Sequence, residues 1–292
     1  PPGYKPFFTL DWIPPYRAER IDALLDAAPR HSLESFERMQ ADVRSRIAME
    51  LLPVAMAAKP SKDAGRKAQA MLQGWSGDMT RDAAAPLVFA AWYRELTRLV
   101  YADELGDLFI ESWDIRAPFM FGVMKGEHGL DAWCDDVRTP VKETCGELAG
   151  LAFDFAAEEL RKRYGDPSRW RWGAAHVAAG DHRPFGFVPG LASIFNVSPE
   201  TPGDTYTIDV GHFFIRDPAR PFANRHAPSL RAIYDLADLD RSVFIHSTGQ
   251  SGNFLSPWYA NFAARWANVE YITIPTRRDA IRAAHTLSLR PQ

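Results

Sequence analysis

The chain has 292 residues, of which 46% are hydrophobic and 12% aromatic, so it can bury a sizeable core and disorder is excluded. Its 34 basic and 37 acidic residues give a net charge of −3 without long runs of one sign, which argues against nucleic acid as a partner. No stretch approaches the roughly 20 apolar residues of a membrane span. The start Pro1-Pro2-Gly3 lacks the regions of a signal peptide, so we expect a soluble chain with a processed start.

The first part of the chain carries helical patterns after an extended start. Residues 1–15 contain five prolines and predict an extended segment packed on a core. Apolar spacing predicts a helix over 17–27 and a second that Ser32 caps and that continues through Leu51. Pro53 is expected to interrupt or end this second helix.

Three further helices are predicted before the pattern changes. A short one ends near Gly74, and another covers 82–99 with a proline in its first turn. The third is expected to start at Thr139 and Pro140 and to run to about Tyr164, just before a glycine. Together these helices are expected to form a layer.

Strand patterns come late in the chain. They are predicted at 205–210, 213–215, 229–235, 242–246 and 271–274. This order of helices first and strands last favours an α+β fold over parallel βαβ units. We expect one structural unit over 1–292, with 1–200 mainly helical and 201–292 made of strand hairpins plus a helix.

The stretch from His226 to Ala267 is the most informative part of the chain. Its two strands flank an acidic turn at 238–240, which predicts a hairpin. The glycine-containing loop 247–253 should turn sharply. A helix is then expected from Ser256 as N-cap and Pro257 as first helical residue.

Two runs in this stretch carry a family resemblance. SLRAIYDLADLDRS followed by STGQSGNFLSPWY resembles the C-terminal signature of the penicillin acylase family, and similar blocks run through nearly the whole chain. Members are N-terminal-nucleophile amidohydrolases that act on penicillins, cephalosporins, lipopeptides and acyl-homoserine lactones. The resemblance implies a four-layer αββα sandwich and an exported, periplasmic or secreted protein.

The resemblance also implies that the nucleophile lies outside this chain. In the family, an inactive precursor cuts itself to expose an N-terminal serine, whose α-amino group acts as the base for its own hydroxyl. Because this chain begins with Pro1, we expect it to be the C-terminal portion of the large (beta) subunit. The nucleophilic serine and the oxyanion asparagine would belong to partner sequence, namely the alpha subunit and the N-terminal part of the beta subunit. The expected substrate is an N-acylated small molecule such as an acyl-homoserine lactone or a β-lactam antibiotic.

One local residue is assigned a role by the resemblance. The block from Pro14 to Ile21 resembles the family's arginine segment, which implies that Arg17 supports the oxyanion site. Arg20 is the competing position, and the alternative for Arg17 is that it merely starts a helix and pairs with a surface acid. The resemblance implies no required cofactor and a structural calcium ion bound mostly outside this chain, with Asp11 as the one local candidate ligand.

Cys134 and Cys145 are the only cysteines. Two thiols cannot complete a structural zinc site without histidines, and His176 and His182 have no recognised ligand spacing. Since the resemblance implies oxidising surroundings, a disulfide between the two cysteines is expected.

Two other readings of the sequence remain open. The run Gly249 to Asn253 nearly matches a nucleophile elbow around Ser251, with Asp279 and His285 downstream, which would make the chain a self-contained serine esterase. The alternative is a structural loop whose side chains bond the local backbone. A non-catalytic binding or scaffold module is the other possibility. We interpret the isolated histidines as structural residues; they are His176, His182, His226 and His246.

Overall fold

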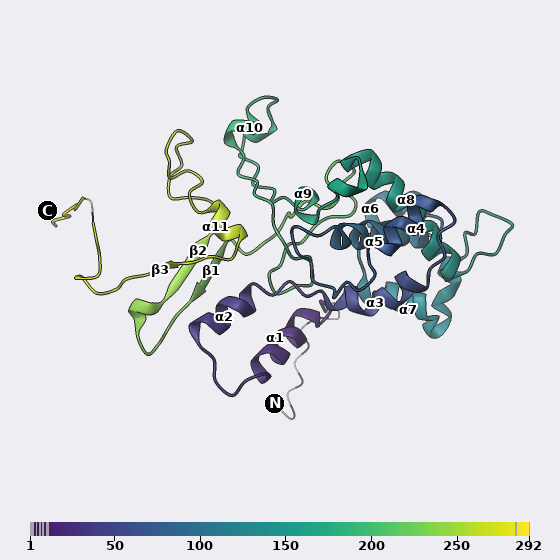
Figure 1. Cartoon of the computed structure of the whole chain (residues 1–292), viewed down its shortest axis with the longest axis horizontal. Helices are drawn as coiled ribbons and strands as arrows, with labels where there is room; N and C mark the ends of the chain where they lie inside the picture. Colours follow the sequence, from purple (N-terminus) through teal and green to yellow (C-terminus); the bar gives the residue numbers. More distant parts are fainter. Residues whose placement is uncertain are drawn as a thin grey trace.

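The computed structural model describes residues 3, 5, 7, 9, 12–283 and 285–291. Helices occupy the first two hundred residues and a small sheet lies near the C-terminus, as Figure 1 shows. The α-helices are α1 (Tyr16–Asp26), α2 (Leu33–Gln40), α3 (Arg46–Ala57), α4 (Asp63–Ala70), α5 (Ala85–Tyr101), α6 (Phe109–Ser112), α7 (Ala117–Lys125), α8 (Cys145–Tyr164), α9 (Trp172–Ala175), α10 (Ala192–Phe195) and α11 (Ala263–Ala267). The 3-10 helices are η1 (Gly106–Leu108), η2 (Glu127–Cys134), η3 (Pro167–Arg169), η4 (Phe185–Phe187) and η5 (Leu239–Arg241). The strands are β1 (Leu230–Ile233), β2 (Val243–His246) and β3 (Ile272–Thr273), and this content makes the fold α+β.

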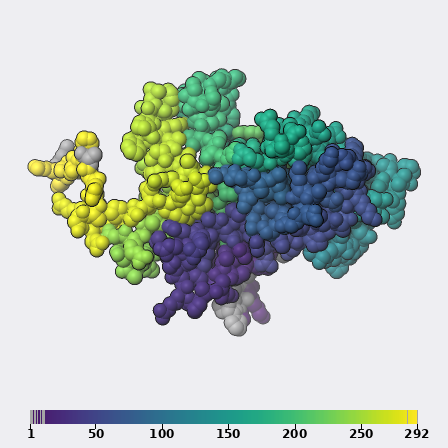
Figure 2. Space-filling view, viewed as in Figure 1, coloured from purple at the N-terminus to yellow at the C-terminus, as the bar shows by residue number. Residues whose placement is uncertain are grey.

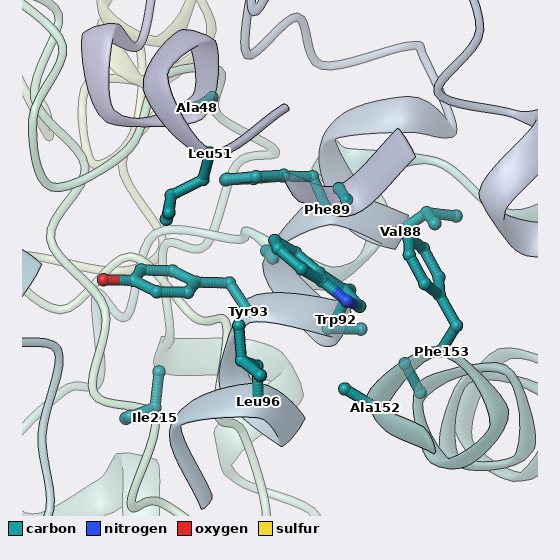
Figure 3. Packing of buried hydrophobic residues seen from close by; sticks show 14 of the residues in the cluster. Ala48, Leu51, Val88, Phe89, Trp92, Tyr93, Leu96, Ala152, Phe153 and Ile215 are labelled. Carbon is teal, nitrogen blue, oxygen red and sulfur yellow. The ribbon is translucent and has the colours of Figure 1, made fainter. Parts of the chain in front are cut away.

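The main core forms where α5 packs against α8. The ring of Trp92 on α5 stacks on Phe153 of α8 with 5.4 Å between ring centroids, and both side chains are fully buried (Figure 3). The Trp92 indole N–H donates to the carbonyl of Ala149 at 3.0 Å, so the polar atom of this large side chain is satisfied inside the core. Burial of so many apolar side chains along one helix explains why α5 sits at the centre of the helical layer.

The helix boundaries confirm some sequence expectations and correct others. Ser32 caps α2 as predicted, with its hydroxyl accepting from the Ser35 N–H at 3.2 Å. The helix expected to continue through Leu51 is instead two helices, because Ser45 supplies a second N-cap that starts α3. Pro53 stands inside α3 and does not end it.

The long helix α8 begins later than predicted. It starts at Cys145, so the expected start at Thr139 and Pro140 is wrong. Thr144 forms a capping box with Glu147, in which each side chain accepts from the other residue's backbone N–H. This reciprocal pairing satisfies two helix-end donors at once, whereas a proline side chain has no group that could accept from either donor. The end of α8 at Tyr164, before Gly165, is confirmed.

The predicted hairpin is confirmed. Strands β1 and β2 pair antiparallel, with Arg231 opposite Ile245, and β3 adds to the other edge of β2. The helix α2 packs near the sheet, since the Gln40 side chain donates to the carbonyl of Ala232 at 3.2 Å and accepts from the Tyr271 hydroxyl at 2.7 Å. These contacts join the hairpin to the N-terminal helices.

The strands predicted at 205–210 and 213–215 do not form. Asp204 accepts from the N–H groups of Tyr206 and Thr207 at 2.7 and 2.9 Å, and the Thr207 hydroxyl donates to the carbonyl of Asp209. Local side-chain bonds therefore replace a strand ladder here. The helix expected from Ser256 is also wrong, because the Ser256 hydroxyl holds a turn through the Trp258 N–H and the helix α11 begins only at Ala263.

A disulfide joins Cys134 to Cys145, as expected, with 5.0 Å between the two Cα atoms. It ties the end of η2 to the first residue of α8. Near the C-terminus, the described residues 274–283 and 285–291 extend away from the body, as Figure 2 shows.

Reducing this disulfide is expected to lower the free energy of unfolding by about 3 kcal/mol at most, because the loop that it closes is short. Urea unfolding with and without reductant measures this loss, and the Cys134→Ser/Cys145→Ser double variant is the control. Titration of the denatured, unreduced protein should find no free thiol. Two titrated thiols would contradict the disulfide.

Candidate active-site groove

A groove of about 810 Å³ lies beside the first turn of α1. Its walls come from the segment before α1, the start of α7, and the loops around 205–212 and 226. The lining side chains are mostly apolar, with six polar or charged residues among them: Arg17, Arg116, Thr205, Tyr206, His212 and His226. The groove therefore combines an apolar surface with a few polar groups, as small-molecule sites do.

Arg17 lies in this groove because its neighbour anchors the helix. Tyr16 is buried, its hydroxyl donates to Glu50 at 2.9 Å, and its ring meets Tyr206 edge to face at 5.5 Å between centroids. Arg17 itself is exposed, and within the described ranges its side chain forms no ion pair or hydrogen bond. The alternative that Arg17 pairs with a surface acid requires an acidic partner, and no described residue supplies one.

Arg20, the competing position, is engaged elsewhere. Its guanidinium binds both carboxylate oxygens of Asp42, at 3.1 Å from Nε to Oδ1 and 2.6 Å from Nη2 to Oδ2. This bidentate geometry holds α1 against the segment after α2. Arg20 does not line the groove.

Two histidines meet in the groove. The backbones of His212 and His226 pair as an antiparallel bridge, and the His212 Nδ1 lies 3.1 Å from the Thr205 hydroxyl. Burial lowers the pKa of His212 below its usual value, so its ring is neutral at pH 7. His212 and Arg116 were not singled out from the sequence, since no local motif marks either residue and the groove is assembled from four separate segments.

The other candidate histidines lie apart from the groove. His182 stacks on Phe185, and the His246 ring contacts the Gln250 side chain at 2.9 Å. His176 is fully buried, and its Nδ1–H donates to the carbonyl of Phe222 at 2.6 Å. Burial lowers its pKa to about 3.

His176 should make stability pH-dependent. Above pH 6.5 the ring is neutral in both states, but at lower pH the unfolded state takes a proton that the folded state refuses until about pH 3. Stability should therefore fall as the pH drops through this window, by about 1.4 kcal/mol per pH unit at the steepest. His176→Asn keeps a donor for Phe222 and should flatten the slope, as measured by urea unfolding between pH 7 and 4. Equal slopes in both proteins would contradict this assignment.

The elbow around Ser251 is not assembled into a triad. Its hydroxyl accepts from the Asn253 N–H at 3.1 Å, which closes a local turn. Asp279 and His285 lie exposed on the C-terminal extension, and among the described residues neither bonds to Ser251. The geometry matches the structural-loop reading.

The described part of the chain offers neither a metal site nor a membrane-spanning helix. No group of three or more His, Cys, Asp or Glu residues there is placed to hold a metal ion. Asp11, the candidate calcium ligand, lies outside the described residues. Within the same part of the chain, no helix has the length and apolar character needed to cross a bilayer.

Comparisons with known proteins agree with this picture. The family model described as Penicillin amidase matches residues 1–283. The chain is 27% identical over 308 residues to an acyl-homoserine lactone acylase QuiP of Pseudomonas aeruginosa, covering 94% of this chain and 36% of that protein. It is 28% identical over 287 residues to a penicillin acylase 2 proenzyme of a Pseudomonas species, strain SE83, covering 95% of this chain and 35% of the relative.

A solved structure shares the fold. The thermostable penicillin G acylase from Alcaligenes faecalis superimposes with a TM-score of 0.56 at 16% identity, covering 100% of this chain and 56% of that one. The chain spans little more than a third of the curated relatives that it matches.

Proposed function

This chain belongs to the penicillin amidase family, and on that premise we propose that it is part of an amidohydrolase that cleaves the amide bond of an N-acylated small molecule. The observation that carries the proposal is the position of Arg17. It falls in the block that resembles the family's arginine segment, and it lines a groove of about 810 Å³ without an ion pair to any residue that the structure describes. A volume of this size suits a drug-sized ligand.

The proposed chemistry is acyl transfer to a serine supplied by sequence outside this chain. The hydroxyl of an N-terminal serine attacks the amide carbonyl while the α-amino group of the same residue takes its proton. Negative charge then develops on the carbonyl oxygen, and donors that stabilise it usually give the largest catalytic effect. In this scheme Arg17 is a positioning residue, which holds an oxyanion asparagine from the partner sequence and adds positive potential.

The partner in this proposal is the rest of the same processed precursor. The apolar face of α1 is in part exposed, with Ile21 39% and Leu25 36% accessible, and Trp12 and Ile13 beside it are also exposed. Exposed apolar side chains of this kind are typical of an interaction surface. We propose that the alpha subunit and the N-terminal part of the beta subunit cover them, complete a four-layer sandwich, and leave residues 1–292 as one structural unit.

The substrates named for the relatives guide the choice of assay. Acyl-homoserine lactones and penicillins are both N-acyl amides, so either is a reasonable first substrate. We also propose a periplasmic or secreted location, with quorum quenching or antibiotic turnover as the outcome. No cofactor is needed in this scheme, and a structural calcium ion would be bound mostly by the partner sequence.

The experiment that tests the proposal identifies everything that copurifies with this chain, by intact mass and N-terminal sequencing. The expected result is a tightly bound polypeptide that starts with serine, in an assembly that releases amine from N-acyl amides. If the chain alone is a stable monomer with full activity, the proposal fails. A fluorophosphonate that labels Ser251 would instead support the esterase, and the absence of any reactive serine would support a non-catalytic module.

A further inference from the structure

The charged side chains among the described residues that line the groove are both positive. Among the described residues that line it, none is Asp or Glu, whereas two are arginines, one from the start of α1 and one from the start of α7. Neither Arg17 nor Arg116 has a hydrogen-bonding or ion-pair partner for its side chain in the part of the chain that the structure describes. Arginines nearby do find partners, as Arg20 binds Asp42 and Arg44 binds Asp78.

Arg116 is held at a fixed position in the groove wall. It is the N-cap residue of α7, and the helix that follows is anchored by the fully buried side chains of Ala117 and Met120. The backbone carbonyl of Arg116 accepts from the Met120 N–H at 2.9 Å, which closes the first helical turn. The first turn of α7 therefore fixes the backbone position from which the Arg116 side chain extends.

No acid in the described part of the chain pairs with the guanidinium of Arg116. Burial raises the pKa of Tyr101 and of Tyr206, which lines the same groove; the charge of Asp114 adds to this rise and that of Arg116 opposes it. Asp114 is a nearby acid, but its carboxylate accepts from the Ile115 N–H at 2.8 Å and lies 4.0 Å from the guanidinium of Arg216. Asp114 is not among the described residues that line the groove, so the charged side chains in that lining are the two arginines.

We propose that Arg116 is a specificity-determining residue that binds a carboxylate on the substrate, so that the preferred substrates are N-acyl amides with a free carboxylate near the scissile bond. The inference rests on the proposed amidohydrolase function. A guanidinium presents a planar fork of donors that matches a carboxylate, and a partly desolvated groove strengthens such a charge-assisted bond. Arg17 on the other wall adds to the positive potential while it positions the oxyanion asparagine.

The test compares two substrates that differ little except in charge. N-octanoyl-homoserine lactone is neutral, and its ring-opened form, N-octanoyl-homoserine, has the same acyl chain and a carboxylate. The processed wild-type enzyme should show a KM for the ring-opened form at least about tenfold lower. Arg116→Gln should raise that KM roughly 10- to 100-fold, with kcat little changed, because a charge-assisted hydrogen bond is lost. The KM for the lactone should stay the same.

The control is Arg38→Gln, which removes one exposed charge from α2, outside the groove, and should leave both KM values unchanged. Arg116→Lys keeps the charge without the fork and should give an intermediate KM. If Arg116 instead pairs with an acid of the partner sequence, Arg116→Gln will destabilise the assembly and leave the ratio of the two KM values as in the wild type. That result overturns the inference.

A measurement on the unmodified enzyme covers the case in which Arg116→Gln does not fold. The ratio of the two KM values should move toward one as salt is raised, because ions screen an accessible pair. A ratio of one already at low salt would overturn the carboxylate preference. Failure to cleave either substrate, or any other N-acyl amide, would overturn the proposed function itself, so the two failures are distinct.

Discussion

Replacing Arg17 with alanine is expected to lower kcat on the order of 10²-fold while the melting temperature of the assembly stays nearly unchanged. The rate effect is of the size seen when one oxyanion donor is lost, because the guanidinium is proposed to hold such a donor in place. Stability should be insensitive because Arg17 is exposed and, within the described residues, its side chain has no bonded partner. The anchoring of α1 belongs to Tyr16 and remains intact.

Arg17→Lys separates charge from geometry. Lysine keeps the positive charge but lacks the fixed fork of donors, so kcat should stay well below that of the wild type. Steady-state kinetics and thermal melts of both variants make the measurement. An unchanged kcat in both would remove Arg17 from the catalytic arrangement.

Arg20 is the matched control for this experiment, three residues away on the same helix. Arg20→Ala breaks the bidentate pair with Asp42, so it should lower the melting temperature and leave kcat almost unchanged. The reverse pattern, with a large loss of kcat at Arg20 and none at Arg17, would assign the family's arginine role to Arg20.

Replacing Arg231 with alanine is expected to cost about 3–5 kcal/mol of stability, because it leaves a buried carboxylate without its partner. Arg231 is 7% exposed and Asp209 is 4% exposed, and the two form an ion pair. A second guanidinium nitrogen donates to the carbonyl of Trp266 at 2.9 Å, and the guanidinium lies over the Trp266 ring at 5.2 Å. Arg231 therefore joins β1, α11 and the 201–210 loop through one side chain.

The pKa of Asp209 shows the cost of burying its carboxylate, which the Arg231 charge partly offsets. Burial raises it to about 6, although the adjacent Arg231 charge opposes the rise. The carboxyl is still ionised at pH 7 and depends on the guanidinium. Urea unfolding of Arg231→Ala, of Asp209→Ala and of the double variant measures the coupling, and the double variant should lose less than the sum of the two single losses.

The half-exposed pair of Arg44 and Asp78 is the control for burial, and Arg44→Ala should cost about 0–1 kcal/mol. A loss below about 1 kcal/mol for Arg231→Ala as well would show that the buried pair contributes no more than a surface one. The structural role assigned to Arg231 would then be wrong.

Local signals in the sequence determined much of the helical layer and the hairpin. The Ser32 cap, the position of α5 and the end of α8 before Gly165 all follow from residues within a few positions of the feature. The hairpin of β1 and β2 follows from two strand-forming runs around an acidic turn. Such signals act through the backbone of the same segment, so they need no knowledge of distant partners.

Other features depended on competition between local signals. Thr139 and Pro140 predicted a helix start, but the capping box of Thr144 and Glu147 satisfies more helix-end donors and places the start at Cys145. Alternation at 205–210 predicted a strand, yet the side chains of Asp204 and Thr207 bond the backbone groups that a ladder would use. The sequence contains both signals in each case, and their relative strength is set by the packing around them.

The groove was decided by the tertiary structure alone. The family resemblance identified Arg17, but His212 and Arg116 lie far from it in sequence and belong to no motif. These residues line one groove because Tyr16 packs on Tyr206 and because α7 is anchored by its own buried face. The sequence by itself therefore determined the family and the disulfide partners, since both depend on residue identity, and the role of Arg17 stays a prediction. Which charges share one groove is set by contacts between distant segments, and only the folded chain brings those segments together.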